Sequence, residues 1–377
     1  MDIFTYFSSI FALVALLLLS LSWRRARKSS RSAPEAGGAW PIVGHLHLLR
    51  APVPLVKTLS ALADKHGPVF MIRLGKPRAL VVSNWEAVKD CFATNDKLLA
   101  ARPTTTQGKY LGYDYAVFSF STYNSYWRKV RKLAVVELLS SRRLEKLKHV
   151  WVTELQANIK ELNINPSKNK VINMSQWFEH LTLNLIVKVV AGRRYEYRSD
   201  GVVDKEAECM KKVFKEVMFL WGEVVSGDAI FPLWFFRWLD YEGHVKTMKR
   251  VAKALDAILQ DWVDARKREN GNGKNEDQGF IDVMLSMIDD QFLEGQTYTR
   301  DTIIKATVLS MLQDGSETFS VHFTWITHLA VARLVQGFNF NTPSNEALDM
   351  SEGLGITMPR ANPLEVVITP RLPSSLY

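Results

Sequence analysis

Trp127 and Arg131 stand four residues apart in a stretch whose apolar pattern is helical. Residues spaced i and i+4 share one helix face, so an indole N–H and a guanidinium lie side by side there. A planar guanidinium fork suits a carboxylate, which gives this pair the chemistry to bind an acidic group. An aromatic core residue beside a surface arginine explains the same spacing, and from the residues alone both interpretations stay open.

The chain contains two cysteines, Cys91 and Cys209. They form no Cys-x-x-Cys pair and no Cys/His cluster, so the sequence predicts neither a disulfide framework nor a metal site. Cys91 lies in an amphipathic stretch where buried cysteine is common, and Cys209 lies among lysines and glutamates. Neither sits in a glycine-rich loop that would aim backbone N–H groups at its sulfur, so neither has the setting of a metal ligand.

The amino-terminal residues predict a membrane anchor. Residues 3–22 carry no charge, and a helix of that length spans about 30 Å, the thickness of a bilayer's hydrocarbon core. Asp2 precedes this run and five basic residues follow it, namely Arg24, Arg25, Arg27, Lys28 and Arg31. That asymmetry predicts a transmembrane signal-anchor at residues 1–23, with the rest of the chain in the cytosol.

The formal charge of +9 does not indicate a nucleic-acid-binding protein. Removing the five basic residues after the anchor leaves +4 for the remainder. Later basic residues are helix-spaced and mixed with apolar ones, which is the pattern of a solvated helix face. An apolar content of 47% with 23% charged residues is that of a globular protein.

The elements predicted to position these residues form a mainly α fold with small β parts. A basic and Pro/Gly-rich linker at residues 24–53 leads to a helix over 54–67 and a hairpin of strands 69–74 and 78–82. Ser83 begins a capping-box sequence that predicts another helix. From Tyr126 onward the pattern is helical, with a polar break at residues 271–277 and an extended piece at 364–369.

Six segments in a fixed order carry a family resemblance. They are PEAGGAWPIVGHLHLL (34–49), YWRKVRKL (126–133), VVAGRRY (189–195), FIDVMLSMIDD (280–290), the helix from Asp301 through Gly315-Ser316-Glu317-Thr318, and the stretch 337–372. Together they resemble the plant microsomal cytochrome P450 haem-thiolate monooxygenases, in the subfamily acting on terpenoids, alkaloids, nicotine-like amines and phenolics. The resemblance implies a cytochrome P450 fold, a haem cofactor, an NADPH-dependent reductase as partner and a small apolar substrate. It also implies a single-pass protein of the endoplasmic reticulum membrane whose catalytic part is cytosolic.

The resemblance assigns roles to particular residues. Trp127 and Arg131 match the pair that hydrogen-bonds a haem propionate, and Gly315 matches a glycine that allows close approach of the haem. Glu317 and Thr318 match the acid and hydroxyl that deliver protons during dioxygen activation, although a solvated helix acid explains Glu317 equally well. Asp314 and Phe319 depart from this helix signature. Phe118 and Phe120 lie in the loop that closes over substrate in the family.

The family's iron-binding loop, Phe-x-x-Gly-x-Arg-x-Cys-x-Gly, does not occur in the 377 residues. The Glu-x-x-Arg pair and the Pro-Glu-Arg-Phe segment of the family are likewise absent. The sequence passes near 326–328 from the long helix into a segment that resembles the helix following the lost cysteine. We therefore expect an internal deletion of roughly 130 residues, dividing the monooxygenase domain into 54–326 and 327–377.

Three functions stay open. The first is a haem-dependent monooxygenase lineage of plant specialised metabolism, inactive in this chain because the axial cysteine loop is missing. The second is a non-catalytic truncated splice product or gene-model fragment that acts as a membrane-bound interaction protein. The third, which rests on the substrate loop alone, is a membrane-anchored ligand-binding protein.

Overall fold

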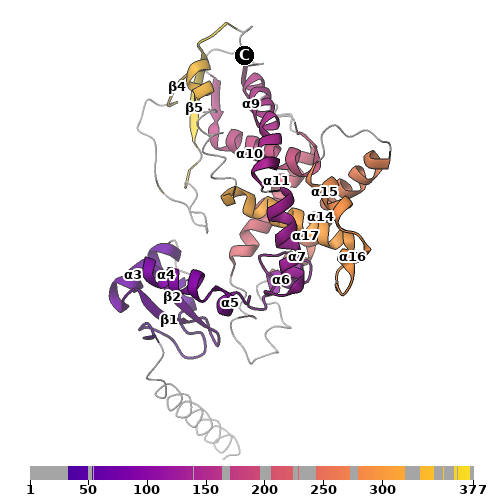
Figure 1. Ribbon diagram of the computed structural model, residues 1–377. Coiled ribbons are helices and arrows are strands. Elements are labelled where there is room, and N and C mark those ends of the chain that lie inside the picture. Colours follow the sequence, from indigo (N-terminus) through magenta and orange to yellow (C-terminus); the bar gives the residue numbers. More distant parts are fainter. Residues whose placement is uncertain are drawn as a thin grey trace, which may run out of the picture.

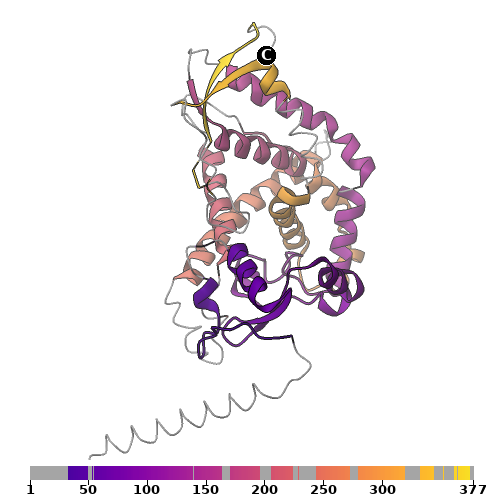
Figure 2. The same cartoon turned by 90° about the vertical axis from the view of Figure 1, so that its left-hand side faces the viewer.

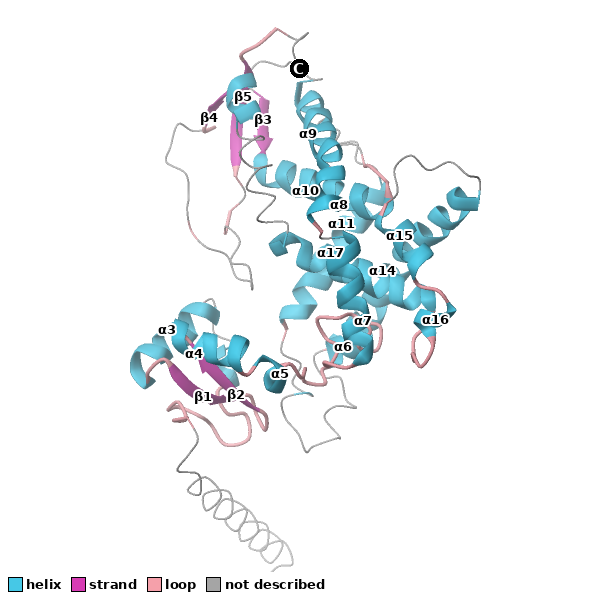
Figure 3. Ribbon diagram, in the orientation of Figure 1, coloured by secondary structure: helices cyan, strands magenta, loops and turns pink. Residues whose placement is uncertain are grey.

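The computed structural model describes residues 33–49, 53, 55–138, 140–163, 170–195, 205–223, 228, 243–271, 279–318, 332–343, 351, 361–362 and 364–373. These residues form a small N-terminal unit, a helical body and a sheet near the carboxyl end (Figure 1). Strands occur at two ends of the molecule, and helices occupy the space between them (Figure 3). The predicted fold class, mainly α with small β parts, is confirmed.

The N-terminal unit is a β-hairpin covered on one face by a helix. Its elements are α2 (Leu46–Leu49), α3 (Leu55–His66), β1 (Val69–Arg73) and β2 (Arg78–Val82). The strands pair antiparallel from Val69 opposite Val82 to Arg73 opposite Arg78. Phe70 and Ile72 of β1 are buried and pack against apolar residues of α3. The predicted helix and hairpin are confirmed, because their signals are local: helical spacing before a glycine, then two apolar runs around a turn.

Residues before the hairpin pack onto it. Ala36 N donates to Met71 O over 2.9 Å, and the buried His45 ring accepts from Arg73 N over 2.9 Å. Gly44 has a φ of 62° and lies so close to the backbone of Arg73 that a Cβ would collide with it. Only glycine fits that position, which explains the glycine after Trp40-Pro41-Ile42-Val43.

Short helices connect this unit to the body. They are α4 (Trp85–Lys89), η1 (Asp90–Thr94, a π-helix), α5 (Asp96–Leu99) and α6 (Thr106–Tyr110). The helix predicted after the hairpin is α4, but its N-cap is Asn84 and not Ser83. The Asn84 side chain accepts from Ala87 N, because the chain turns into the helix one residue later than the capping-box spacing indicated.

The helical body is built from long amphipathic helices. In chain order its elements are α7 (Ser125–Leu133), η2 (Ala134–Leu138), α8 (Ser141–Lys146), α9 (Lys148–Asn163), α10 (Met174–Ala191), α11 (Lys205–Gly222), α14 (His244–Gly271), α15 (Phe280–Met287), α16 (Asp290–Leu293) and α17 (Arg300–Thr318). On α14, buried side chains recur at Met248, Val251, Leu255, Leu259 and Trp262. This three- and four-residue spacing turns one stripe of the helix toward the core. Figure 2 shows the long helices crossing one another in the middle of the molecule.

A three-stranded sheet joins segments far apart in sequence. Its order is β3 (Lys170–Asn173), β5 (Glu365–Pro370) and β4 (Phe338–Asn341), all antiparallel. Val366 and Ile368 of β5 point into a satellite core with Trp177 of α10 and Leu334. The predicted extended piece at 364–369 is confirmed, whereas β3 and β4 were not predicted.

Among the described helices, none combines the length and apolarity needed to cross a bilayer. The predicted anchor at residues 1–23 lies outside the described residues, as does the predicted junction near 326–328.

Candidate active site

The loop 111–124 and the start of α7 are held together by side chains at the loop's two ends. Asn124 caps α7, its Oδ1 accepting from Trp127 N over 2.8 Å. The buried Tyr126 hydroxyl donates to Ala116 O over 2.7 Å. Burial, and to a lesser extent Tyr298, raises the pKa of Tyr126 far above its ordinary value, so this hydroxyl remains a donor. These bonds fix the loop on the helix.

Three consecutive residues of this loop, Tyr113, Asp114 and Tyr115, have φ values of 51°, 52° and 68°. A left-handed conformation costs a non-glycine residue about 1–2 kcal/mol, so such a turn persists only where surrounding contacts impose it. Two hydroxyls supply such contacts: Tyr298 OH donates to Asp114 O over 2.8 Å, and Tyr115 OH donates to Thr105 O over 2.9 Å. The body thus holds the loop through Tyr298.

The Trp127 and Arg131 side chains lie on one helix face, as their spacing predicts. The Arg131 guanidinium carbon is 5.1 Å from the centre of the Trp127 ring. The indole Nε1 donates to Phe118 O over 3.1 Å, so that donor is engaged by the loop. The structure therefore brings together Phe118, Trp127 and Arg131, with the arginine side exposed. Their assignment to a haem propionate stays a prediction.

Phe120 faces a different partner. Its ring meets Trp221 of α11 edge-on, with centroids 5.4 Å apart. Beyond Trp221 the chain contacts α6: Asp228 accepts from Thr106 N over 2.7 Å and from the Thr106 hydroxyl over 2.8 Å. Asp228 thereby satisfies the first N–H of α6 from more than one hundred residues away. Neither Trp221 nor Asp228 was singled out from the sequence, because only tertiary contact reveals them.

The long helix α17 carries the predicted proton-delivery residues at its carboxyl end. The backbone is helical through Thr318, but the side chains from residue 313 onward, and with them Gly315, Glu317 and Thr318, lie outside the described residues. In the described half, Thr307 and Ser310 are buried and donate to carbonyl groups four residues earlier in their own helix. Those two hydroxyls are therefore committed to the backbone.

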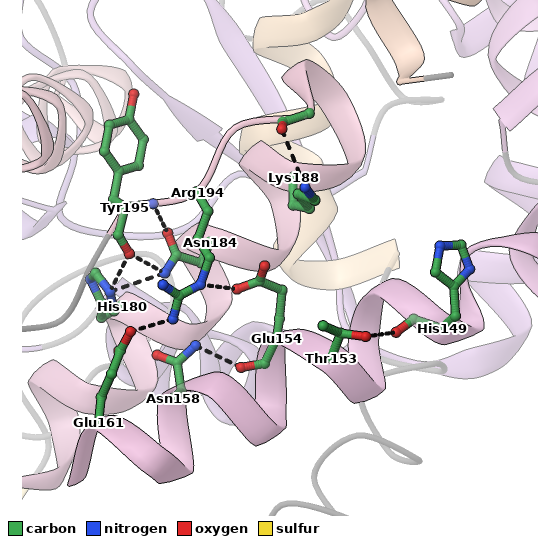
Figure 4. A network of polar contacts seen from close by, with 11 residues as sticks. His149, Thr153, Glu154, Asn158, Glu161, His180, Asn184, Lys188, Arg194 and Tyr195 are labelled. Atoms are coloured by element: carbon green, nitrogen blue, oxygen red, sulfur yellow. Dashed lines mark hydrogen bonds and ion pairs between the residues drawn. The ribbon is translucent and has the colours of Figure 1, made fainter. Parts of the chain in front are cut away.

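A buried polar network joins α9, α10 and the segment that follows α10 (Figure 4). Arg194 pairs with Glu154 over 2.9 Å and also with Glu161, both on α9. The carbonyl of Tyr195 accepts from Asn184 Nδ2 over 2.7 Å, and His180 Nε2 lies 3.0 Å from the same oxygen. The network locks the segment after α10 onto α9.

Two groups of this network depart from their ordinary protonation behaviour. Burial, followed by the charge of Lys211, lowers the pKa of His180 to about 4. Burial, followed by Glu206, raises the pKa of Tyr195 to about 12. Both side chains are therefore neutral at neutral pH, which suits positions inside a packed body. Their role is to position helices.

The two cysteines lie apart from the loop and from Trp127 in sequence and in element. Cys91 is partly buried in the π-helix η1, and Cys209 is exposed on α11. Within the described residues no cluster of three His, Cys, Asp or Glu side chains has the arrangement of a metal site.

Comparison with known proteins identifies the family to which this fold belongs. The family model for cytochrome P450 matches residues 34–336, so the chain belongs to the cytochrome P450 family. The chain is 33% identical over 506 aligned residues to nicotine N-demethylase of Nicotiana tabacum, covering 96% of this chain and 97% of that protein. It is 34% identical over 484 residues to vinorine hydroxylase of Rauvolfia serpentina, covering all of both chains. It is 43% identical over 337 residues to strychnine-10-hydroxylase of Strychnos nux-vomica, covering 85% of this chain and 63% of that protein.

Within the family, the chain belongs with the monooxygenases of plant specialised metabolism. The family implies haem as cofactor, a reductase as redox partner and a small-molecule substrate. Among the described residues, the Trp127 N–H is engaged by Phe118 O, and both cysteines lie in helical segments.

Proposed function

We propose that this chain is a monooxygenase-lineage protein that does not assemble the haem-thiolate catalyst. The thiolate is the electron-donating axial ligand of the family's haem. Of the two cysteines that this sequence offers, Cys209 stands exposed on α11 among charged neighbours, and Cys91 lies in η1, a helical segment between the N-terminal unit and the body. The proposal rests on this placement of the two cysteine sulfur atoms. Neither residue has the rigid surrounding shell that fixes a metal ligand.

The lengths of the alignments support an internal deletion as the cause. The match to nicotine N-demethylase extends over 506 positions and covers 97% of that protein. A chain of 377 residues leaves at least 129 of those positions (506 less 377) without a counterpart. The match of higher identity to strychnine-10-hydroxylase covers 85% of this chain but only 63% of that protein, in keeping with a junction near residues 326–328.

The sheet at the carboxyl end supports a deletion that keeps the reading frame. Strand β5 follows the proposed junction and β3 precedes it, yet the two pair along four residues, from Lys170 opposite Ile368 to Asn173 opposite Glu365. Val366 and Ile368 alternate into the core as a genuine strand requires. Sequence read in another frame would not retain that alternation. Sequencing the transcript across codons 320–335 tests this point, and an uninterrupted genomic stretch there would favour a true short protein.

Spectroscopy tests the absence of the catalyst. The full chain, expressed with haem supplied and purified, should give no thiolate Soret band in a carbon monoxide difference spectrum. The nicotine N-demethylase treated identically is the matched control and should give that band. A normal thiolate band from this chain would overturn the proposal, and Cys91→Ala and Cys209→Ala would then identify the ligand.

The domain limits and membrane placement belong to the same proposal. Residues 1–23 form the signal-anchor, 24–53 the linker, and 54–326 and 327–377 the two parts of one domain. The protein is a single-pass protein of the endoplasmic reticulum membrane with its body in the cytosol. Protease added to sealed microsomes should digest the body and spare only the anchor. Protection of the body would place it in the lumen and contradict this topology.

The predicted site residues are testable once the missing segment is restored. A chimera carrying the corresponding demethylase segment between Ile326 and Thr327 is expected to bind haem. In that chimera, Trp127→Phe and Arg131→Gln should weaken haem retention. Thr318→Ala and Glu317→Gln should leave retention unchanged and lower product formation, and Gly315→Leu should obstruct haem binding. Equal haem retention in every variant would refute the assigned roles.

A second candidate function, ligand binding without catalysis, rests on the aromatic contact between Phe120 and Trp221. The relatives are named for nicotine, vinorine and strychnine, so apolar amines are the first ligands to titrate. Binding near Trp221 should change its fluorescence, and Trp221→Phe should remove that signal. A Phe118→Ala and Phe120→Ala variant should weaken the affinity, while unchanged fluorescence over all three amines counts against this function.

A further inference from the structure

No strand among the described residues pairs with the outer edge of strand β2. The bonds Ser83 N to Pro68 O and Leu74 N to Pro77 O mark the hydrogen-bonded pairs of the hairpin. Because such pairs alternate along an antiparallel ladder, Ala79 and Val81 turn their backbone groups toward β1. The N–H and C=O groups of Arg78, Leu80 and Val82 therefore point away from the hairpin, and none of the described residues bonds to them.

The same strand exposes apolar side chains. Ala79 and Val81 pack toward α3 with Phe70 and Ile72. The opposite face carries Val69 and Met71 of β1 with Leu80 and Val82 of β2, followed at the turn end by Arg73 and Arg78. Leu80 is 46% exposed. Natural proteins blunt such edges with charges, prolines or bulges. Here the one charged residue of the strand is Arg78, at its first position.

We propose that β2 pairs antiparallel with β2 of a second copy of this chain, with the twofold axis at Leu80. This register places Leu80 opposite Leu80 of the second copy and Arg78 opposite Val82. All three outward-facing residues then become hydrogen-bonded pairs, because each presents both a donor and an acceptor. The interface is isologous, and the two hairpins become one four-stranded sheet. On one face, Met71 and Leu80 of both copies form an apolar row, with Arg73 and Arg78 of each copy beside it.

Charge and sequence favour a second copy over an unrelated strand. In this register no like charges stand opposite each other. The two arginines at position 78 are four residues apart along the ladder, roughly 14 Å at the rise of an antiparallel strand. That separation exceeds the Debye length of about 8 Å at physiological ionic strength, so their repulsion is largely screened. A strand that reads Arg-Ala-Leu-Val-Val is thus complementary to itself.

Disulfide trapping tests the register. Leu80→Cys is introduced in a full-length chain carrying Cys91→Ala and Cys209→Ser, and the protein is oxidised in detergent. The paired Cα atoms of a hydrogen-bonded pair lie about 5.5 Å apart, within the range that a disulfide spans. A covalent dimer is expected on a non-reducing gel. The matched control, Ala79→Cys, faces α3 and should stay monomeric; crosslinking at 79 but not at 80 would overturn the register.

Sedimentation in detergent tests the dimer itself. The chain without substitutions should be dimeric, and Leu80→Lys should weaken association at least tenfold by placing two ammonium groups opposite each other. Leu98→Lys is the control for general stickiness, since Leu98 is 80% exposed on α5 and lies outside the strand. It should leave the dimer intact. The proposal would be overturned if the chain were monomeric at every concentration, or if the dimer were insensitive to Leu80→Lys. It would also be overturned if Leu98→Lys weakened the dimer equally, or if a monomeric chain bound a strand of a different protein.

Discussion

The N-terminal unit and the helical body differ in how completely they bury their apolar side chains. The N-terminal unit buries only Ala36, Phe70 and Ile72 as a cluster, and it leaves Val56 57% and Leu80 46% exposed. In the body, α14 contacts α11, α15 and α17, and residues such as Trp262 are wholly buried. An amphipathic element closes a core only when the chain supplies a partner for its apolar face. In the body, the described helices cover one another's apolar faces. In the N-terminal unit, the single helix α3 covers one face of the hairpin.

The largest expected effect comes from a buried ion pair of the body. Arg266 of α14 donates from Nε to Asp282 of α15 over 2.9 Å, and Asp282 also accepts from Gly279 N over 2.8 Å. Both side chains are buried, so Asp282→Ala leaves a buried guanidinium short of its partner. Breaking such a pair costs about 3–5 kcal/mol. Urea unfolding should show that loss across the body, and Asp282→Asn should restore part of it; a cost below about 1 kcal/mol would mean the pair behaves as a surface one.

A core substitution in the N-terminal unit tests whether the two regions unfold separately. Phe70 is fully buried, and Phe→Ala in a core costs about 3–5 kcal/mol. The lower end is expected, because few neighbours surround it. Hydrogen exchange should show loss of protection in β1 and β2 with the body unchanged. Loss of protection in α14 as well would contradict this expectation, because it would show that the two regions unfold as one cooperative unit.

Protonation of His180 should weaken the body selectively. Its pKa is about 4 in the folded state, against about 6.5 when unfolded. Between these values the unfolded chain binds more protons, so the stabilising contribution is complete above pH 6.5 and is lost as pH falls toward 4. The shift corresponds to about 3 kcal/mol at most. The free energies of unfolding measured with urea at pH 7.5 and 4.5 should differ by most of that amount. The substitution His180→Gln should reduce this difference.

Local signals in the sequence predicted the elements whose partners are near in the chain. The hairpin 69–82 and the helical pattern that stops at the polar break 271–277 follow from turn residues and helical spacing. The strands β3 and β4 have four residues each and pair with β5 far along the chain, so their short patterns could not be distinguished from loops. A strand of that length is specified by its partner more than by its own residues.

Some features of the site could likewise be predicted from local spacing, and others could not. The shared face of Trp127 and Arg131 follows from a four-residue spacing, and the structure places the guanidinium over the indole. The engagement of the indole by Phe118 O and the contact of Phe120 with Trp221 depend on loop conformation. Asp228 bonds to Thr106 across more than one hundred residues, and no periodicity encodes that distance. Sequence therefore identified residues, and tertiary packing decided their partners.

The smallest expected effect locates the boundary between the two regions. Tyr298 of the body donates to Asp114 O in the left-handed turn, and Asp114 is exposed. Tyr298→Phe should therefore cost only about 1 kcal/mol, since water can satisfy the freed carbonyl. Tyr126→Phe, which leaves the buried Ala116 O without its donor, should cost about 1–3 kcal/mol. If both losses appear as reduced protection of loop 111–124 alone, that loop belongs to the body and the boundary lies before α6. If the hairpin loses protection as well, the loop transmits stability between the regions, and the boundary must be drawn elsewhere.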